Sequence, residues 1–256
     1  MRARLAEERA IFLLALQFLT RLPLPWDLGY TPARMAATPR WHPGVGVLVG
    51  GLAGLVFALA AEVWPPALAA LVSTAAGLLL TGALHEDGFA DACDGLGGGV
   101  TRDAALEIMR DSRLGTYGAA GLGLMLGAKV LALAALPVAA VPLVLVAGHT
   151  SSRASSVLVI ATSRYVRDHG AGKPVAEGIG PGGLAFALGT GAAAVLTLAV
   201  ALPAAAVAGG ALGLAAGQVA MRARFERRLG GYTGDCLGAV QQTSEVGLYL
   251  GVLARL

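Results

Sequence analysis

Four carboxylates lie within nine residues of the segment 85–95, at Glu86, Asp87, Asp91 and Asp94. If this segment is helical, Asp87, Asp91 and Asp94 are spaced i, i+4 and i+7 and fall within a narrow arc of one helix face. Like charges on one face repel one another, and a bound cation removes that repulsion. An all-oxygen set of ligands suits a hard ion. The spacing therefore favours a Mg²⁺ site, with Mn²⁺ as the alternative ion, over a merely solvated charged face.

Three further residues outside this segment have the chemistry to complete such a site. Asp111 and Arg113 come just before an apolar segment that begins near Thr116. Asp111 is a candidate metal ligand, and the Arg113 guanidinium can hold a phosphate through two parallel hydrogen bonds. The alternative for this pair is a surface ion pair. Asp235 follows a glycine-rich turn and opens the last apolar segment. It either adds a carboxylate to the metal site from another helix or caps the helix that it begins.

Charged residues also occur inside apolar segments, at Lys129, Arg153 and Glu245. A charge near the middle of a membrane span costs about 2.5–3.5 kcal/mol on insertion scales, so a functional role is the first expectation. Lys129 and Arg153 are predicted either to bind an anionic substrate or to pair with an acidic residue. His149 lies four residues before Arg153 on the same helix face. We interpret it as a polar contact between helices rather than as a metal ligand.

The elements that must position these residues are membrane-spanning helices. Hydrophobic residues make up 56% of the 256-residue chain and charged residues only 14%, whereas soluble domains average about 25% charged residues. A span needs about 20 mostly apolar residues. The segments that meet this requirement are 44–63, 66–84, 116–136, 138–162, 183–202, 204–221 and 237–253. The prolines at 65–66, 137 and 203 indicate tight turns between paired spans.

The glycine spacing indicates close contacts between helices. Gly46, Gly50 and Gly54 form one stripe of small residues at every fourth position, and Gly123 and Gly127 form another. Small residues let two helices approach closely in lipid, so both stripes are predicted to face a neighbouring helix.

The basic residues lie at one end of this expected bundle. With the N-terminus in the cytoplasm, 16 of the 19 lysines and arginines fall in the segments 1–43, 85–115, 163–182 and 222–236. The proline-containing turns of the opposite side carry none, and positively charged loops usually face the cytoplasm. The distribution predicts a cytoplasmic site on a protein of the cell inner membrane. Because the positive charges serve the topology, the net charge of +3 does not indicate a nucleic-acid partner.

A single domain is expected, because residues 1–256 contain no obvious linker, repeat or low-complexity tail. The sequence before the first span combines early arginines and glutamates with a short apolar run. It predicts a helix that lies along the cytoplasmic interface rather than a signal peptide. The expected fold is all-α, a polytopic transmembrane bundle of about seven spans in the lipid bilayer, with an N-terminal interfacial helix. The sequence leaves the formation of a homo-oligomer open.

Four segments resemble, in the expected order, the motifs of the cobalamin synthases, which are adenosylcobinamide-GDP ribazoletransferases. The segments are 18–23, 85–95, 109–118 and 231–239. The acidic motif of that family, His-x-Asp-Gly-x-x-Asp-x-x-Asp-Gly, is matched at His85, Asp87, Gly88, Asp91, Asp94 and Gly95. Glu86 falls at a variable position of the motif and is not counted as a ligand.

The resemblance implies a Mg²⁺-dependent phosphotransferase. Its substrates would be adenosylcobinamide-GDP and α-ribazole or α-ribazole 5′-phosphate, and its products adenosylcobalamin or its 5′-phosphate and GMP. The ribazole 3′-hydroxyl would attack the corrinoid-side phosphorus, with a carboxylate or His85 taking its proton. The implied catalytic residues are His85, Asp87, Asp91, Asp94 and Arg113. The implied metal ligands are Asp87, Asp91, Asp94, Asp111 and Asp235. The implied substrate-binding residues are Arg21, Arg113, Arg153 and Lys129.

Two other functions fit parts of the sequence. CDP-alcohol phosphatidyltransferases also carry Asp-x-x-Asp-Gly beside membrane spans, as in the segment 91–95. Their pattern continues with an Ala-Arg pair and further aspartates, whereas three glycines occupy 97–99 here. A cation-coupled transporter could use the carboxylates as an ion path. Its acids would be expected at mid-membrane, and these cluster in a segment predicted to be cytoplasmic.

Overall fold

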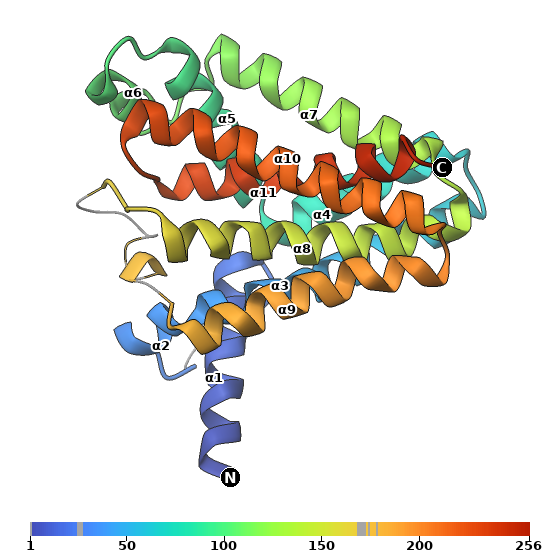
Figure 1. Ribbon diagram of the computed structural model, residues 1–256, viewed down its shortest axis with the longest axis horizontal. Helices are drawn as coiled ribbons and strands as arrows, with labels where there is room; N and C mark the ends of the chain where they lie inside the picture. Colours follow the sequence, from blue (N-terminus) through green and yellow to red (C-terminus); the bar gives the residue numbers. More distant parts are fainter. Residues whose placement is uncertain (1, 25–27, 168–172, 174, 178) are drawn as a thin grey trace.

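The computed structural model describes residues 2–24, 28–167, 173, 175–177 and 179–256, which form a bundle of helices (Figure 1). The α-helices are α1 (Arg2–Leu19), α2 (Pro32–Ala37), α3 (His42–Ala61), α4 (Pro66–Thr81), α5 (Leu84–Gly98), α6 (Arg102–Ile108), α7 (Thr116–Ala135), α8 (Val141–Thr162), α9 (Pro181–Thr197), α10 (Ala204–Leu229) and α11 (Gly234–Leu253). Short 3₁₀ turns are η1 (Thr38–Trp41), η2 (Val138–Ala140), η3 (Val175–Glu177) and η4 (Leu198–Val200). These ranges contain no β-strand, so the all-α prediction is confirmed.

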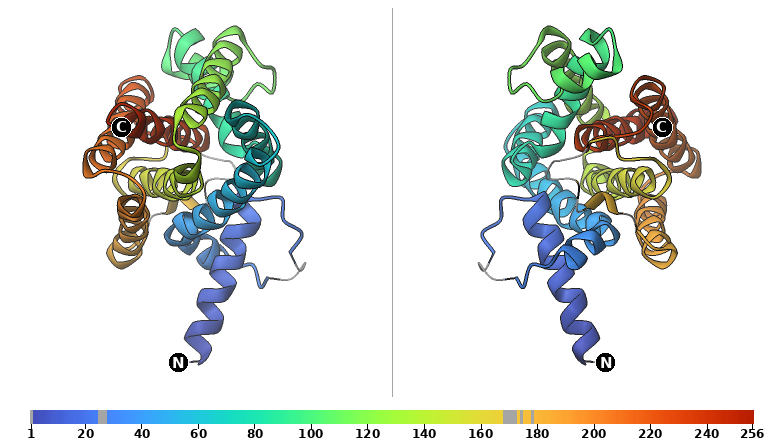
Figure 2. Two further views of the ribbon diagram at one scale, coloured as in Figure 1. Left: turned by 90° about the vertical axis from the view of Figure 1, so that its right-hand side faces the viewer. Right: turned by 90° about the vertical axis from the view of Figure 1, so that its left-hand side faces the viewer.

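Two helices make up the centre of the bundle. α8 contacts α3, α9 and α11, and α11 contacts α10, α5, α8 and α7. Viewed end-on, α8 runs near the middle of the molecule (Figure 2). Burial agrees with this arrangement, because 78% of an apolar 18-residue window within Val138–Thr162 is buried in the protein, against 22–44% of the corresponding windows in the other candidate spans. Polar side chains on α8 and α11 therefore face the interior of the protein.

Five helices are long and apolar enough to cross a membrane, and a sixth crossing counts if α4 and α5 are one bent span. The described residues thus include five to six helices able to span a membrane, as in a multi-pass membrane protein, and the expected number of about seven spans is not confirmed. The difference has two physical causes. α11 carries Gln241, Gln242 and Glu245 and is not among the five. α4 has only 16 residues.

Prolines and one left-handed corner separate the helices. α4 begins at Pro66, η2 follows Pro137 and α10 follows Pro203, which confirms the predicted turns. Between α4 and α5, Gly82 and Ala83 have φ values of 65° and 56°, and the helix pair is bent by 92°. A left-handed backbone conformation costs a residue with a Cβ about 1–2 kcal/mol. The packing around Ala83 must therefore stabilise this conformation. The corner directs α5 away from the line of α4.

One of the two glycine stripes packs against a helix as predicted. A methyl group at Gly46 would overlap the backbone of His149, and the other two glycines of that stripe also lie against α8. The second stripe does not, because, apart from the adjoining residues and backbone of α7 itself, no atom of the described chain lies within 4 Å of a side-chain position at Gly123 or Gly127. α7 contacts α5, α4 and α11 through its other faces. This stripe therefore faces outward.

The polar segments gather at one end of the bundle, which holds α2, α6, the residues that directly follow α8 and the start of α11 (Figure 1). α1 runs across the direction of the long helices and projects beyond them (Figure 1). Its first turns are exposed, whereas Ile11, Leu14 and Leu19 are buried. That orientation suits a helix lying along a membrane surface, and the interfacial role stays a prediction.

Candidate functional site

The acidic segment is helical, as the spacing of its carboxylates requires. It forms α5, along which Asp87, Asp91 and Asp94 are exposed, half-buried and buried in turn. Glu86 points into the bundle instead, where its Oε1 accepts a hydrogen bond from the Gln242 amide at 2.8 Å. This contact agrees with leaving Glu86 out of the acidic face.

Asp94 uses both of its carboxylate oxygens to hold α7. The Gly115 N–H donates to Oδ2 and the Gly118 N–H donates to Oδ1, each at 2.8 Å. Both amides belong to the N-terminal end of α7, where N–H groups lack intrahelical partners and the helix dipole favours an anion. A side chain at either glycine would overlap the carboxylate. Asp94 thus positions α7 against α5, and its role as a metal ligand stays a prediction.

Asp235 lies in the first turn of α11, beside α5. Gly88 packs against it, since a methyl group on Gly88 would be 3.0 Å from the Asp235 Cα. The cap of α11 is Thr233, whose Oγ1 accepts a hydrogen bond from the Cys236 N–H at 3.4 Å. The alternative that Asp235 caps this helix is therefore wrong. Its carboxylate instead pairs with Arg167 across 2.8 Å.

A pocket of about 280 Å³ opens among α5, α8 and α11. Asp87 and Asp235 line its outer part, where Asp87 is exposed and the Asp235 side chain is 18% exposed. Its inner end is lined by His42, His85 and Arg153, which are only 2–8% exposed. The pocket therefore has an acidic outer part and a nitrogen-rich inner end. Apolar walls connect the two, formed by Phe18, Leu19, Leu84, Ile160, Val175 and Leu237.

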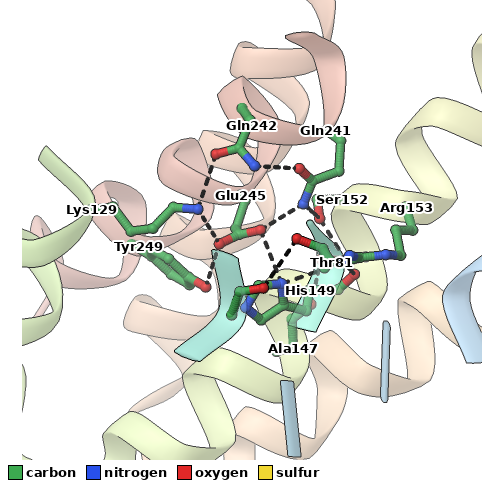
Figure 3. Close-up of polar contacts among 12 residues, drawn as sticks. Thr81, Lys129, Ala147, His149, Ser152, Arg153, Gln241, Gln242, Glu245 and Tyr249 are labelled. Carbon is green, nitrogen blue, oxygen red and sulfur yellow. Dashed lines mark hydrogen bonds and ion pairs between the residues drawn. The ribbon is translucent and has the colours of Figure 1, made fainter. Parts of the chain in front are cut away.

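A network of buried polar groups lies beside the inner end of the pocket (Figure 3). The Lys129 Nζ lies 2.9 Å from Glu245 Oε1 and donates to Gln242 Oε1 at 2.9 Å. Glu245 Oε2 accepts a hydrogen bond from Gln241 at 2.6 Å and lies 3.2 Å from His149 Nδ1. Lys129 thus takes the second of its two predicted roles, pairing with an acidic residue. His149 makes the predicted polar contact between helices.

Arg153 joins this network to the pocket. Its Nη1 donates to the His149 carbonyl oxygen at 2.9 Å, and its side chain lines the pocket. No carboxylate of the described residues forms an ion pair with the guanidinium within 4.0 Å, and its Nε has no hydrogen-bond partner there. Glu245 and Glu86 act on its charge from a longer distance. His42 lines the same pocket, and its buried Nε2 also lacks a partner among those residues.

Asp111, Arg113 and Arg21 do not line the pocket. Asp111 and Arg113 pair with each other in the turn before α7, with the Arg113 Nε 3.0 Å from both carboxylate oxygens. The guanidinium lowers the pKa of Asp111 to about 2. Arg21 is exposed and packs against Gly82 at the corner between α4 and α5. The metal and substrate roles of these three residues stay predictions that no contact in the described chain supports.

The carboxylates fit a hard divalent cation by their chemistry but do not form a ready-made site. No three His, Cys, Asp or Glu side chains of the described residues are close enough together to hold a metal ion. Asp87, Asp91 and Asp235 offer only oxygen atoms, which Mg²⁺ prefers. The charges of Asp235, Asp87 and Asp94 all act on the Asp91 carboxyl group. A divalent cation would relieve this repulsion.

The polar residues of the pocket that the sequence did not single out include His42, Arg167 and Tyr165. His42 could have been found as a polar residue at the very start of an apolar span. Arg167 counted only as a topology signal, because nothing in its spacing relates it to Asp235. The loop that carries it is held beside α11 by backbone pairing, in which Tyr232 N–H donates to the Arg164 carbonyl at 2.8 Å.

The chain is similar over nearly its whole length to one protein family. The family model described as cobalamin-5-phosphate synthase matches residues 11–253. A curated relative from Leptothrix cholodnii, named adenosylcobinamide-GDP ribazoletransferase, is 48% identical over 98% of both chains. A relative of the same name from Vibrio parahaemolyticus is 41% identical over 98% of this chain and 95% of its own. One from Ralstonia nicotianae is 42% identical over 99% and 98%. No solved structure matches the chain.

Proposed function

Because the chain belongs to the cobalamin-5-phosphate synthase family of transferases, we propose that it joins adenosylcobinamide-GDP to α-ribazole or α-ribazole 5′-phosphate and releases GMP. The products are adenosylcobalamin or its 5′-phosphate. The reaction depends on Mg²⁺ and takes place at the cytoplasmic face of the inner membrane. The family match supports this reaction over the phosphatidyltransferase and transporter alternatives.

The pocket between α5, α8 and α11 is the observation that carries this proposal. Its outer part brings together Asp87 and Asp235 from segments nearly 150 residues apart in the chain. Its inner end supplies buried nitrogen donors at His42, His85 and Arg153. Negative and positive groups at opposite ends of one cavity suit a reaction between two polar substrates. The carboxylates would bind one substrate through a cation, and the buried nitrogen donors would bind the other directly.

The reaction is a displacement at phosphorus. The acceptor 3′-hydroxyl oxygen forms a bond to the corrinoid-side phosphorus, and the bond from that phosphorus to the bridging oxygen breaks. The bridging oxygen leaves with GMP, and the hydroxyl proton passes to a pocket carboxylate or to His85. Positioning and charge stabilisation supply most of the rate in such transfers.

The residues of this chain divide these tasks between the two ends of the pocket. Asp87 and Asp235 would hold Mg²⁺ at the outer part, and Asp91, which does not line the pocket but feels both charges, would be the third ligand. The ion would neutralise charge on the diphosphate and on the leaving GMP. Arg167 limits the repulsion among the carboxylates, because its guanidinium is paired with Asp235. His85 lines the pocket two residues before Asp87, where a hydroxyl proton could reach it.

The cytoplasmic orientation is supported by charge placement. The pocket is lined in part by the start of α11 and by Tyr165 and Arg167, which follow α8, and these segments are at the same end of the bundle as α6 (Figure 1). Those segments belong to the arginine-rich regions that carry most of the positive charge of the chain. Positively charged loops stay on the cytoplasmic side during membrane insertion.

Membranes containing the chain provide the test. Incubation with adenosylcobinamide-GDP, α-ribazole and Mg²⁺ should release GMP and form adenosylcobalamin in equal amounts, as measured by chromatography. An Asp87→Asn variant should insert normally and lose most of this activity, whereas Asp103→Asn, at an exposed position on α6, should keep it. Absence of GMP release from the unaltered chain would contradict the proposal.

A further inference from the structure

The inner end of the pocket contains a buried cation without a counter-ion in contact. Arg153 is 2% exposed, and no carboxylate of the described chain pairs with it. The nearby carboxylate of Glu245 is already engaged by Lys129, Gln241 and Tyr249. Burying a charge is costly unless it is paired and hydrogen-bonded. An anion that enters the pocket would supply what Arg153 lacks.

Two buried nitrogen atoms are available to such an anion. The Nε of Arg153 and the Nε2 of His42 are buried and have no hydrogen-bond partner among the described residues. The two residues come from different helices, α8 and α3, yet line the same pocket. Arg153 is near enough for its charge to act on His42. His42 is held in place by stacking on Phe18, with ring centroids 6.2 Å apart.

The volume of the pocket limits the size of the anion that can bind in it. At about 280 Å³ it is just below the usual range of about 300–1,000 Å³ for ligand pockets. A corrinoid is much larger than such a ligand and must stay outside, whereas a nucleoside monophosphate fits. The apolar walls at Phe18, Ile160 and Leu237 suit its base.

We propose that Arg153 and His42 form a subsite for a phosphate monoester, which holds the 5′-phosphate of the acceptor nucleotide while its 3′-hydroxyl points to the carboxylates. This inference rests on the proposed function, because it assigns one substrate to one end of the same pocket. The guanidinium supplies the charge and the imidazole a hydrogen-bond donor, as is usual for phosphate recognition. The acceptor thus binds in the interior of the protein, and the corrinoid diphosphate approaches the outer part of the pocket from outside.

The test compares two acceptors that differ only in the phosphate. With purified protein in liposomes and saturating adenosylcobinamide-GDP, kcat/KM is measured for α-ribazole and for α-ribazole 5′-phosphate. The unaltered chain should prefer the phosphorylated acceptor. Arg153→Gln should lower kcat/KM for that acceptor by about 10- to 100-fold, mainly through KM, because a hydrogen bond to a charged group is lost. For unphosphorylated α-ribazole the change should stay within about threefold.

Matched variants separate binding from folding. His42→Phe keeps the stack on Phe18 but removes the donor, and His42→Gln restores a donor, so only the first should lose preference for the phosphate. Arg222→Gln makes the same exchange as Arg153→Gln on α10, where Arg222 bonds Glu226 and Thr162 outside the pocket. It should leave both acceptors unaffected. An equal loss for both acceptors in Arg153→Gln and His42→Phe would overturn the subsite.

Binding without turnover distinguishes this inference from the proposed function. Calorimetric titration with each acceptor, and with GDP, needs no corrinoid. If the chain shows no transfer yet binds α-ribazole 5′-phosphate more tightly than α-ribazole, and Arg153→Gln removes the difference, the subsite stands and the reaction does not. Equal binding of both acceptors refutes the subsite, whatever the activity. Arg153-dependent binding of GDP alone would assign the phosphate to the other substrate and also refute it.

Discussion

The Gly118 N–H donates a hydrogen bond to Asp94 Oδ1 at 2.8 Å, which fastens the N-terminal end of α7 to α5. The other oxygen of the same carboxylate accepts the Gly115 N–H at the same distance. An acidic side chain expected to bind metal therefore already serves as a helix cap supplied from another helix. The two roles predict different consequences when Asp94 is changed.

Asp94→Asn should destabilise the protein, because one capping oxygen becomes an amide that cannot accept a hydrogen bond. Loss of a cap costs about 0.5–2 kcal/mol, which corresponds to a fall in Tm of about 1–8 °C for a chain of this size. Thermal unfolding in detergent measures it. If Tm is unchanged while transfer activity disappears, Asp94 acts as a metal ligand and the cap is secondary.

The sequence predicted the elements of this site better than their contacts. The 3.6-residue period places Asp87 and Asp91 on one face of α5, and that inference needs only local geometry. The hydrogen bond from Gly115 to Asp94 joins residues 21 positions apart, and no local sequence pattern specifies it. Contacts of this kind depend on how the helices pack.

The buried charged residues also show that a sequence predicts elements better than contacts. The free-energy cost of a charge in an apolar segment singled out Lys129 and Arg153. It did not decide whether each of them binds a substrate or pairs with an acidic residue. The structure assigns them differently: Lys129 contacts Glu245, which is 116 positions away, and Arg153 reaches the pocket. The seventh predicted span is unconfirmed for a related reason, because the polar residues Gln241, Gln242 and Glu245 keep α11 from being apolar enough to count as a span.

Lys129 and Glu245 should behave as a coupled pair. Lys129→Met leaves a buried carboxylate without its cation, and removing one partner of a buried pair costs about 3–5 kcal/mol. Adding Glu245→Gln should recover part of that loss, since the remaining group is neutral. A double-mutant cycle of unfolding free energies measures the coupling. Additive effects of the two changes would show that the 2.9 Å contact contributes no stability.

Removal of divalent cations should abolish transfer, and Mg²⁺ should restore it. Asp87→Asn and Asp235→Asn each remove one proposed oxygen ligand, so the Mg²⁺ concentration for half-maximal activity should rise about tenfold or more. Asp103→Asn is the control, because its side chain is 91% exposed on α6. An unchanged Mg²⁺ requirement in both pocket variants would exclude these carboxylates as ligands, and full activity in chelator would exclude the metal itself.

Gly88→Ala should lower activity more than stability. A methyl group at Gly88 would lie 3.0 Å from the Asp235 Cα, so α5 and α11 must move apart by a few tenths of an ångström. That shift displaces Asp87 relative to Asp235 in the outer part of the pocket, and small misplacements at a reacting centre can lower kcat by about 100-fold.

Gly123→Ala makes the same exchange on α7, where no described atom outside the adjoining part of α7 lies within 4 Å of the new methyl group. Because alanine favours a helix over glycine by about 1 kcal/mol, this control should be neutral or slightly stabilising and fully active. The decisive quantity is the ratio of the two kcat values at matched protein levels. A ratio near one would mean that the contact between Gly88 and Asp235 does not position the carboxylates, and that the outer part of the pocket tolerates movement of α11.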